Sequence, residues 1–165
     1  MDRIVFKPIG RVHSPFSQTV GMPIQPGGAR GVAGSVVLYD EFTGGLADLD
    51  GFSHIILLYH FHLSRGYSLQ VRPFLDETKR GVFSTRAPRR PNPLGLSIVK
   101  LVGVEGNTLH IENVDILDGT PLLDIKPYVP GFDAAEADRI GWLSDRVGEV
   151  GDVNSDGRFG PSAGV

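Results

Sequence analysis

Apolar and polar residues along this chain alternate in short runs that are typical of β-strands. The longest apolar run, residues 53–62 (SHIILLYHFH), predicts a central strand that is covered on both faces. Residues 97–104 and 108–114 predict a β-hairpin that turns at Gly106 and Asn107. Further short strands are predicted at residues 4–12, 35–39, 81–85 and 122–125. The pattern therefore favours a mainly β protein.

One segment near the C-terminus has a helical pattern instead. Asp133 can cap a helix over residues 133–147, and Glu136 stands three residues later, as in a capping box. Apolar residues then recur on one face of this helix. Residues 148–165 are rich in glycine and lack periodicity, so we predict a disordered tail there. We expect a small antiparallel β-barrel with a C-terminal helix, in one domain over residues 1–147.

Composition narrows the class of protein. A length of 165 residues suits about one domain, and 22 Gly with 12 Pro suit short strands joined by long loops. The chain has no cysteine, which excludes disulfides and thiolate metal sites. No apolar run is long enough to span a membrane, and the N-terminus lacks the core of a signal peptide. We therefore expect a cytoplasmic protein with no membrane partner.

The charge is concentrated in one part of the chain. The whole sequence carries a net charge of −3, whereas residues 65–100 hold eight basic and two acidic residues, a net +6. Such a block can bind the phosphates of a nucleic acid. A solvated basic surface that keeps the protein soluble is the alternative, and charge alone leaves both interpretations open.

Common catalytic and nucleotide-binding motifs are missing from the sequence. It has no GxxxxGK[ST] loop, no GxGxxG fingerprint and no GxSxG elbow. His60 and His62 are two apart on the predicted central strand and share a face, but no third ligand stands near them. Packing at the rim of a pocket is the better interpretation, and we expect no metal.

Two segments combine chemically active residues with rigid ones. Residues 83–95 (FSTRAPRRPNPLG) hold three arginines and an asparagine among prolines, an arrangement that presents backbone groups and guanidinium groups to an anionic ligand. Residues 115–128 (DILDGTPLLDIKPY) interleave three aspartates, a lysine and a tyrosine with apolar residues. Asp124 and Lys126 can share a face, either as a surface ion pair or as groups of a site.

Together these segments resemble the TsaA-like family, also called TrmO, of S-adenosylmethionine-dependent tRNA methyltransferases. The resemblance runs from about residue 9 to residue 133. It rests on stretches that occur in one order: Pro8-Ile9-Gly10, Ser14-Pro15-Phe16, Gln25-Pro26-Gly27, Gly51-Phe52-Ser53-His54, Phe61-His62, Arg72-Pro73, Gly81-Val82-Phe83, Thr85-Arg86, Arg90-Pro91-Asn92-Pro93-Leu94-Gly95, Asp118-Gly119-Thr120-Pro121 and Asp124-Ile125-Lys126-Pro127-Tyr128.

The resemblance implies both an architecture and an activity. It implies a small β-barrel and a homodimer that holds the cofactor, S-adenosylmethionine, near the subunit interface. It also implies N6-methylation of threonylcarbamoyl-adenosine beside the anticodon of a threonine tRNA. The sequence departs from the bacterial members at Ile24 and Ala87, where Arg and Ser are common. Those members also continue into a further C-terminal domain.

The resemblance further implies roles for individual residues. Four are expected to act on the substrate amine or shape its pocket: His62, Asp124, Lys126 and Tyr128. Twelve are expected to bind the cofactor: Gln25, Phe61, Phe83, Ser84, Thr85, Arg86, Arg90, Asn92, Asp118, Gly119, Thr120 and Leu123. Three are expected to meet tRNA phosphates: Lys79, Arg80 and Arg89. The group that accepts the proton of the amine stays unassigned.

Two other functions remain open at this point. One is a methyltransferase that acts on another RNA or on a small molecule. The other is an S-adenosylmethionine-binding regulatory or RNA-binding module without turnover. The basic block at residues 65–100 favours a nucleic-acid substrate over a small one.

Overall fold

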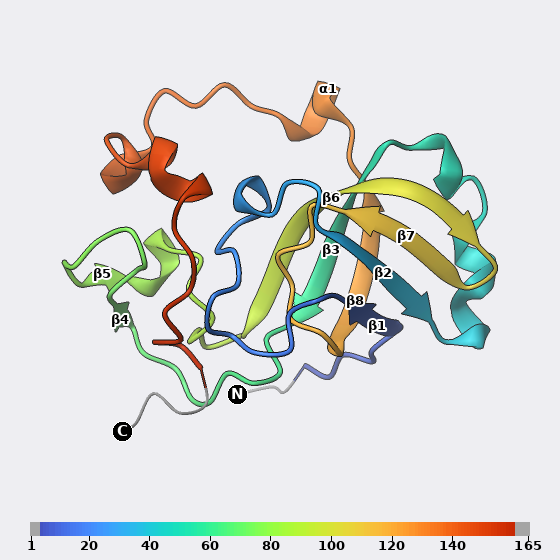
Figure 1. Cartoon of the computed structure of the whole chain (residues 1–165), viewed down its shortest axis with the longest axis horizontal. Helices are drawn as coiled ribbons and strands as arrows, with labels where there is room; N and C mark the ends of the chain where they lie inside the picture. Colours follow the sequence, from blue (N-terminus) through green and yellow to red (C-terminus); the bar gives the residue numbers. More distant parts are fainter. Residues whose placement is uncertain (1–3, 161–165) are drawn as a thin grey trace.

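Six antiparallel strands close into a barrel, drawn in the right half of Figure 1. The computed structural model describes residues 4–160. The strands follow one another around the barrel in the order β1, β2, β7, β6, β3, β8. Their bounds are β1 Gly10–His13, β2 Ala33–Leu38, β3 His54–His60, β6 Leu94–Glu105, β7 Thr108–Glu112 and β8 Thr120–Pro127. The predicted mainly β barrel is thereby confirmed.

Strand β3 shows how the apolar pattern builds this core. Ile55, Leu57 and Tyr59 point into the barrel and are at most 5% exposed. The residues between them, including Ile56 and Leu58, are only half-buried on the outer face. The prediction that both faces are covered is therefore wrong. These apolar residues remain partly exposed because no layer of helices in the described chain packs over the outer face of the barrel at β3.

The predicted hairpin is confirmed, with a bulge that the sequence did not indicate. β6 and β7 pair antiparallel and are joined through Gly106, whose φ of 58° favours glycine. Their register shifts between Leu101 and Gly103. The first strand begins only at Gly10, later than the predicted residue 4.

Loops and short elements make up the rest of the described chain. A second, two-stranded sheet pairs β4 (Gln70–Val71) with β5 (Arg80–Gly81). The segment predicted as a strand at 81–85 is mostly a 3-10 turn. The 3-10 turns are η1 Pro26–Gly28, η2 Asp40–Leu46, η3 Leu49–Gly51, η4 Val82–Ser84, η5 Gly141–Leu143 and η6 Val147–Gly151. Within residues 4–160, no helix has the length and hydropathy needed to cross a bilayer.

The helix predicted over residues 133–147 is absent from the structure. A single turn, α1 (Pro130–Asp133), is followed by exposed, non-helical chain up to η5. Asp133 does not cap a following helix, because its carboxylate accepts the backbone N–H of Val129 at 2.7 Å. Gly141 takes a φ of 60°, which ends any helical continuation. Tertiary contacts of Trp142 and Arg146, described below, replace the helical face.

Residues 148–160 pack on loops outside the barrel strands, although the sequence predicts a disordered tail over 148–165. Asn154 forms a β-bridge with Pro23, and Ser155 exchanges backbone hydrogen bonds with Gly21 (2.7 Å) and Met22 (2.9 Å). Phe159 packs edge-to-face on Phe74, with ring centroids 5.1 Å apart. In Figure 1 this red segment lies beside the green 63–93 region. Residues 161–165 of the predicted tail lie outside the described residues.

Candidate functional site

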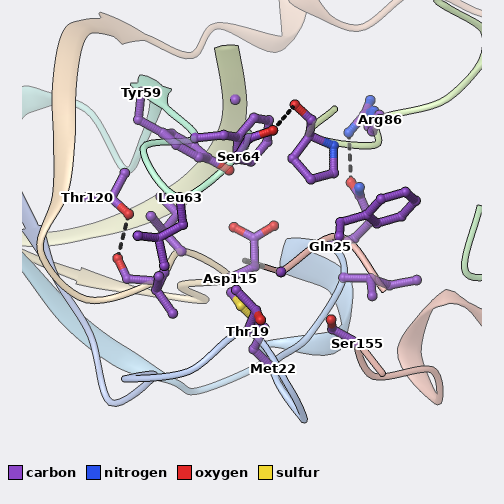
Figure 2. A pocket seen from close by; sticks show the side chains of 18 of the residues that line it. Thr19, Met22, Gln25, Tyr59, Leu63, Ser64, Arg86, Asp115, Thr120 and Ser155 are labelled. Carbon is purple, nitrogen blue, oxygen red and sulfur yellow. Dashed lines mark hydrogen bonds between the residues drawn. The ribbon is translucent and has the colours of Figure 1, made fainter. Parts of the chain in front are cut away.

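A cavity of about 360 Å³ opens at the end of the barrel where β3 finishes and β6 and β8 begin. This volume is within the range of small-molecule sites, about 300–1,000 Å³. Segments far apart in the sequence meet around it, as Figure 2 shows. Its lining residues lie within 19–25, 59–64, 85–90, 94–96, 115–120 and 155–160, together with Phe74.

One wall of the cavity depends on a glycine. A Cβ on Gly95 of β6 would overlap the ring of Tyr59, its partner on β3. The Tyr59 ring therefore lies against the β6 backbone at Gly95, and it makes a T-shaped contact with the ring of Phe61, with centroids 5.5 Å apart. Gly95, Tyr59 and Phe61 all line the cavity.

A chain of hydrogen bonds links that wall to a carboxylate. The Tyr59 and Ser97 hydroxyls are 3.0 Å apart, and Ser97 donates to Asp115 Oδ1 at 2.7 Å. Burial raises the pKa of Asp115 to about 6, against the lowering effects of the Ser97 hydrogen bond and Arg86. Burial, followed by the charge of Asp115, also raises the pKa of Tyr59 well above its ordinary value. The cavity thus holds a carboxylate that is a stronger base than an exposed aspartate.

A cationic group faces the cavity from another loop. Arg86 donates to the side-chain oxygen of Gln25 at 2.8 Å, a bond drawn in Figure 2. This bond joins the 85–90 loop to the 19–25 loop. Gln25, Arg86 and Thr85, all predicted to bind the cofactor, do line the cavity.

Arg90 holds this loop in shape. Its guanidinium donates to the carbonyl oxygens of Thr85 at 2.7 Å and Val82 at 3.0 Å. Ser64 fastens the same loop by donating to the carbonyl of Pro88 at 3.1 Å. Arg90 lines the cavity, but its hydrogen bonds serve the loop. Its position indicates that it shapes the site.

His62, Phe61 and Thr120, also predicted as site residues, line the cavity as well. Burial, followed by the charges of His60 and Arg11, lowers the pKa of His62. The imidazole is therefore neutral at pH 7. Thr120 is 3% exposed, and its hydroxyl donates to the carbonyl of Leu117 at 2.7 Å.

Six predicted cofactor residues lie outside the cavity lining: Phe83, Ser84, Asn92, Asp118, Gly119 and Leu123. The turn at 117–120 explains two of them. Asp118 accepts the backbone N–H of Ser14 at 3.2 Å, and the Gly119 carbonyl accepts Arg11 at 2.8 Å. Both residues therefore face the β1 side of the turn. Ser84 contributes through its backbone, because its carbonyl accepts the Trp142 indole N–H at 2.8 Å.

Three predicted catalytic residues lie toward the opposite end of the barrel. Asp124 lines a second cavity of about 430 Å³ together with Ile125 and Pro127. It forms an ion pair with Lys126, with a distance of 2.8 Å between Asp124 Oδ2 and Lys126 Nζ. Tyr128 lies with its ring centroid 6.4 Å from that of His54.

The residues predicted to meet tRNA phosphates differ in their surroundings. Lys79 is exposed. Arg80 is engaged within the protein, because it donates twice to the buried carboxylate of Asp76, at 2.6 and 2.9 Å. Arg89 is half-buried, with its backbone carbonyl accepting the N–H of Ser68 at 3.2 Å.

The sequence analysis missed several groups at the cavity. Asp115 begins the segment 115–128 but received no role. Tyr59 and Ser97 were hidden by the strand pattern, which marks inward residues without saying which of them border a cavity. Ser155 and Phe159 fell in the predicted tail. Among residues 4–160, no cluster of three or more His, Asp or Glu side chains is arranged to hold a metal ion.

Comparisons with known proteins agree with this architecture. The profile of the tRNA-methyltransferase O N-terminal domain matches residues 11–134. A probable S-adenosyl-L-methionine-binding protein of Pyrococcus abyssi is 54% identical over 94% of this chain and 85% of its own length. A tRNA (adenine(37)-N6)-methyltransferase of Mus musculus is 37% identical over 81% of this chain, which spans only 32% of the mouse protein.

A solved structure gives the same result in three dimensions. The crystal structure of TrmO from Pseudomonas aeruginosa superposes with a TM-score of 0.73 at 39% sequence identity. The match covers 87% of this chain and 62% of the Pseudomonas chain.

Proposed function

Because this chain belongs to the family of the tRNA-methyltransferase O N-terminal domain, we propose that it binds S-adenosylmethionine and transfers its methyl group to the N6 amine of an adenine in tRNA. The observation that carries this proposal is the cavity at the barrel end. It places the carboxylate of Asp115 and the guanidinium of Arg86 within one apolar enclosure. The guanidinium can pair with a ligand's carboxylate, and the apolar lining can pack on its rings.

The residues of this cavity suit that cofactor. S-adenosylmethionine supplies a methyl group on a positively charged sulfur, which leaves as a neutral thioether. Arg86, held by Gln25, is suited to the cofactor's carboxylate. Phe61 and Leu63 offer apolar contacts to its adenine, and residues of the 155–160 segment line another part of the cavity. Methyl transfer by displacement needs positioning and a proton acceptor, and no covalent enzyme intermediate.

We further propose threonylcarbamoyl-adenosine beside the anticodon of a threonine tRNA as the substrate. The support is the net +6 of residues 65–100, of which Lys79 is exposed. Lys79 and Arg89 are proposed to meet tRNA phosphates, whereas Arg80 holds Asp76. With this role we also propose a cytoplasmic location.

A homodimer is part of the same proposal. Leu94, Leu96 and Ile98 on the outer face of β6 are 41%, 49% and 37% exposed, and the first two also line the cavity. A second copy seated on this row would bury it beside the cofactor. The catalytic roles of Asp124, Lys126 and Tyr128 remain predictions. These residues lie outside the first cavity of their own chain, so the predicted roles require a second copy whose cavity they could reach.

The test is methyl transfer from labelled S-adenosylmethionine to tRNA from a strain that lacks this gene, followed by nucleoside mass spectrometry. Methylated threonylcarbamoyl-adenosine supports the full proposal. Label in another nucleoside supports the methyltransferase but not this substrate. The control uses Arg86→Ala, which we expect to lose cofactor binding and label together.

A binding protein without turnover is the second candidate. It is favoured by the name of the Pyrococcus relative, which describes S-adenosyl-L-methionine binding alone. Calorimetric binding of S-adenosylmethionine with no label in tRNA or small molecules would support it over the enzyme.

A further inference from the structure

Asp115 is the anionic side chain at the cavity, and its hydrogen bonds have a defined direction. Ser97 has a single proton and donates it to Asp115 Oδ1 at 2.7 Å. The Tyr59 hydroxyl, 3.0 Å from Ser97, must therefore be the donor of the next bond. The order is Tyr59 to Ser97 to Asp115.

The rest of the carboxylate faces the ligand space. In Figure 2 the Asp115 carboxylate points into the cavity, between Leu63 on one side and Gln25 on the other. Ser97 is 1% exposed and cannot swing away, so the carboxylate is held in one orientation. A carboxylate held in place from behind and open in front is arranged to take up a proton from a ligand.

The proposed reaction needs such a group. The lone pair of an adenine N6 amine is delocalised into the ring, and a carbamoyl substituent withdraws it further. When this nitrogen forms a bond to the methyl carbon, it must lose its N–H proton to remain neutral. Within the described cavity lining, His62 is the other candidate base, and the cationic groups are Arg86 and Arg90.

We propose that Asp115 accepts this proton through the carboxylate oxygen that Ser97 does not occupy, with Ser97 and Tyr59 as positioning residues. The inference rests on the proposed methyl transfer and deepens it. The C–S bond breaks and its electron pair stays on sulfur as a thioether. The C–N bond forms from the nitrogen electrons, and the N–H proton moves to Asp115.

The acidity of Asp115 supports this assignment. Burial raises the pKa of the carboxyl to about 6, so about nine tenths of the molecules remain ionised at pH 7. The group is thus both available as a base and stronger than an ordinary aspartate. Arg86 and the Ser97 hydrogen bond act in the opposite direction and keep it from becoming neutral at pH 7.

Asp115→Asn tests the proposal because it keeps the shape and removes the basicity. We expect methyl transfer to tRNA to fall at least ~100-fold, while the calorimetric Kd for S-adenosylmethionine stays within about threefold. Asp138→Asn, at an exposed position outside the cavity, is the matched control and should leave both unchanged. A rate within threefold of the wild type overturns the proposal. So does a loss of cofactor affinity that equals the loss of rate, which would make Asp115 a binding group.

A second measurement does not depend on turnover. In the ligand-free protein, carboxyl NMR should show Asp115 titrating near pH 6. Ser97→Ala removes a hydrogen bond to the charged form, so the titration and the acid limb of the rate profile should move together to higher pH. Titration near the ordinary aspartate value, or a rate limb that stays in place, contradicts the assignment. If the wild type binds S-adenosylmethionine but methylates nothing, the proposed function fails and this inference fails with it, an outcome distinct from those above.

Discussion

Tyr59 and Gly95 face each other across β3 and β6, and the ring of Tyr59 fills the space where any other residue at position 95 would carry its side chain. This contact sets the position of the Tyr59 hydroxyl, and through Ser97 that of Asp115. One glycine in a strand thus fixes one side of the cavity.

Gly95→Ala should therefore lower both stability and activity. The added methyl must displace the Tyr59 ring, and overpacking of this kind costs about 1–3 kcal/mol, or several degrees in Tm. Calorimetric unfolding measures the first effect and methyl transfer the second. Gly103→Ala in the same strand meets open space and is the matched control. Equal Tm values for the two variants would contradict the role of Gly95.

Asp115 predicts how stability depends on pH. Its pKa is about 6 in the folded protein and lower in the unfolded chain, so the folded state holds more protons between pH 4 and 6. Stability should fall as pH rises through this window. Asp115→Asn removes this loss of stability. The free energy of unfolding of the variant, relative to that of the wild type, should therefore rise by at most about 3 kcal/mol between pH 4 and pH 7. Denaturant unfolding at four pH values checks this, and a constant difference would contradict it.

Asp76 should have the opposite pH dependence. The N–H of Thr78 and the guanidinium of Arg80 lower the pKa of this carboxyl to about 2. Its stabilising effect is complete above pH 4 and is lost as the pH falls toward 2. Asp76→Asn should lower the Tm at pH 7. The variant should also lose less stability than the wild type as the pH falls from 4 toward 2. Glu77→Gln, at the neighbouring exposed position, should change the Tm little. A similar Tm for both variants would contradict the stabilising role of the Asp76–Arg80 interaction.

Trp142 should report on the cavity loop. It is the one tryptophan of the chain, and its indole donates to the carbonyl of Ser84 at 2.8 Å. We expect its fluorescence to change when S-adenosylmethionine binds, because the same loop carries Thr85 and Arg86 to the cavity.

Trp142→Phe separates the hydrogen bond from the packing of the ring. Loss of a bond worth about 1 kcal/mol should weaken cofactor binding by about fivefold without unfolding the protein. Ser144→Ala, which removes a hydrogen bond local to its own turn, serves as the control. An unchanged Kd in Trp142→Phe would show that this contact does not hold the loop.

The predicted strands were confirmed where apolar and polar residues alternate along one continuous segment and the strands pair through a short turn. In the hairpin of β6 and β7, the apolar period and the turn at Gly106 were both visible in the sequence. The helix over 133–147 failed because its local signals compete with distant partners. Asp133 binds Val129, and Trp142 and Arg146 hydrogen-bond to Ser84 and Leu75, so each residue is held by contacts that its own segment does not contain.

For the cavity, the sequence indicated residues in its loops such as Gln25, Arg86 and His62. The sequence did not indicate that Thr120 and Asp124, both on β8, border different cavities. The spacing of residues along a strand does not show which loops meet at each end of the barrel.

Sequence alone determined the β character, the basic block and the family motifs, because these depend on residue type and on near neighbours. Closure of the barrel decided the rest. It brought β3, β6 and the 115–120 turn together, and so gave Asp115 a half-buried position, a hydrogen-bond donor and a raised pKa. Burial and electrostatic environment are properties of the assembled fold, and they made this aspartate different from the others in its segment.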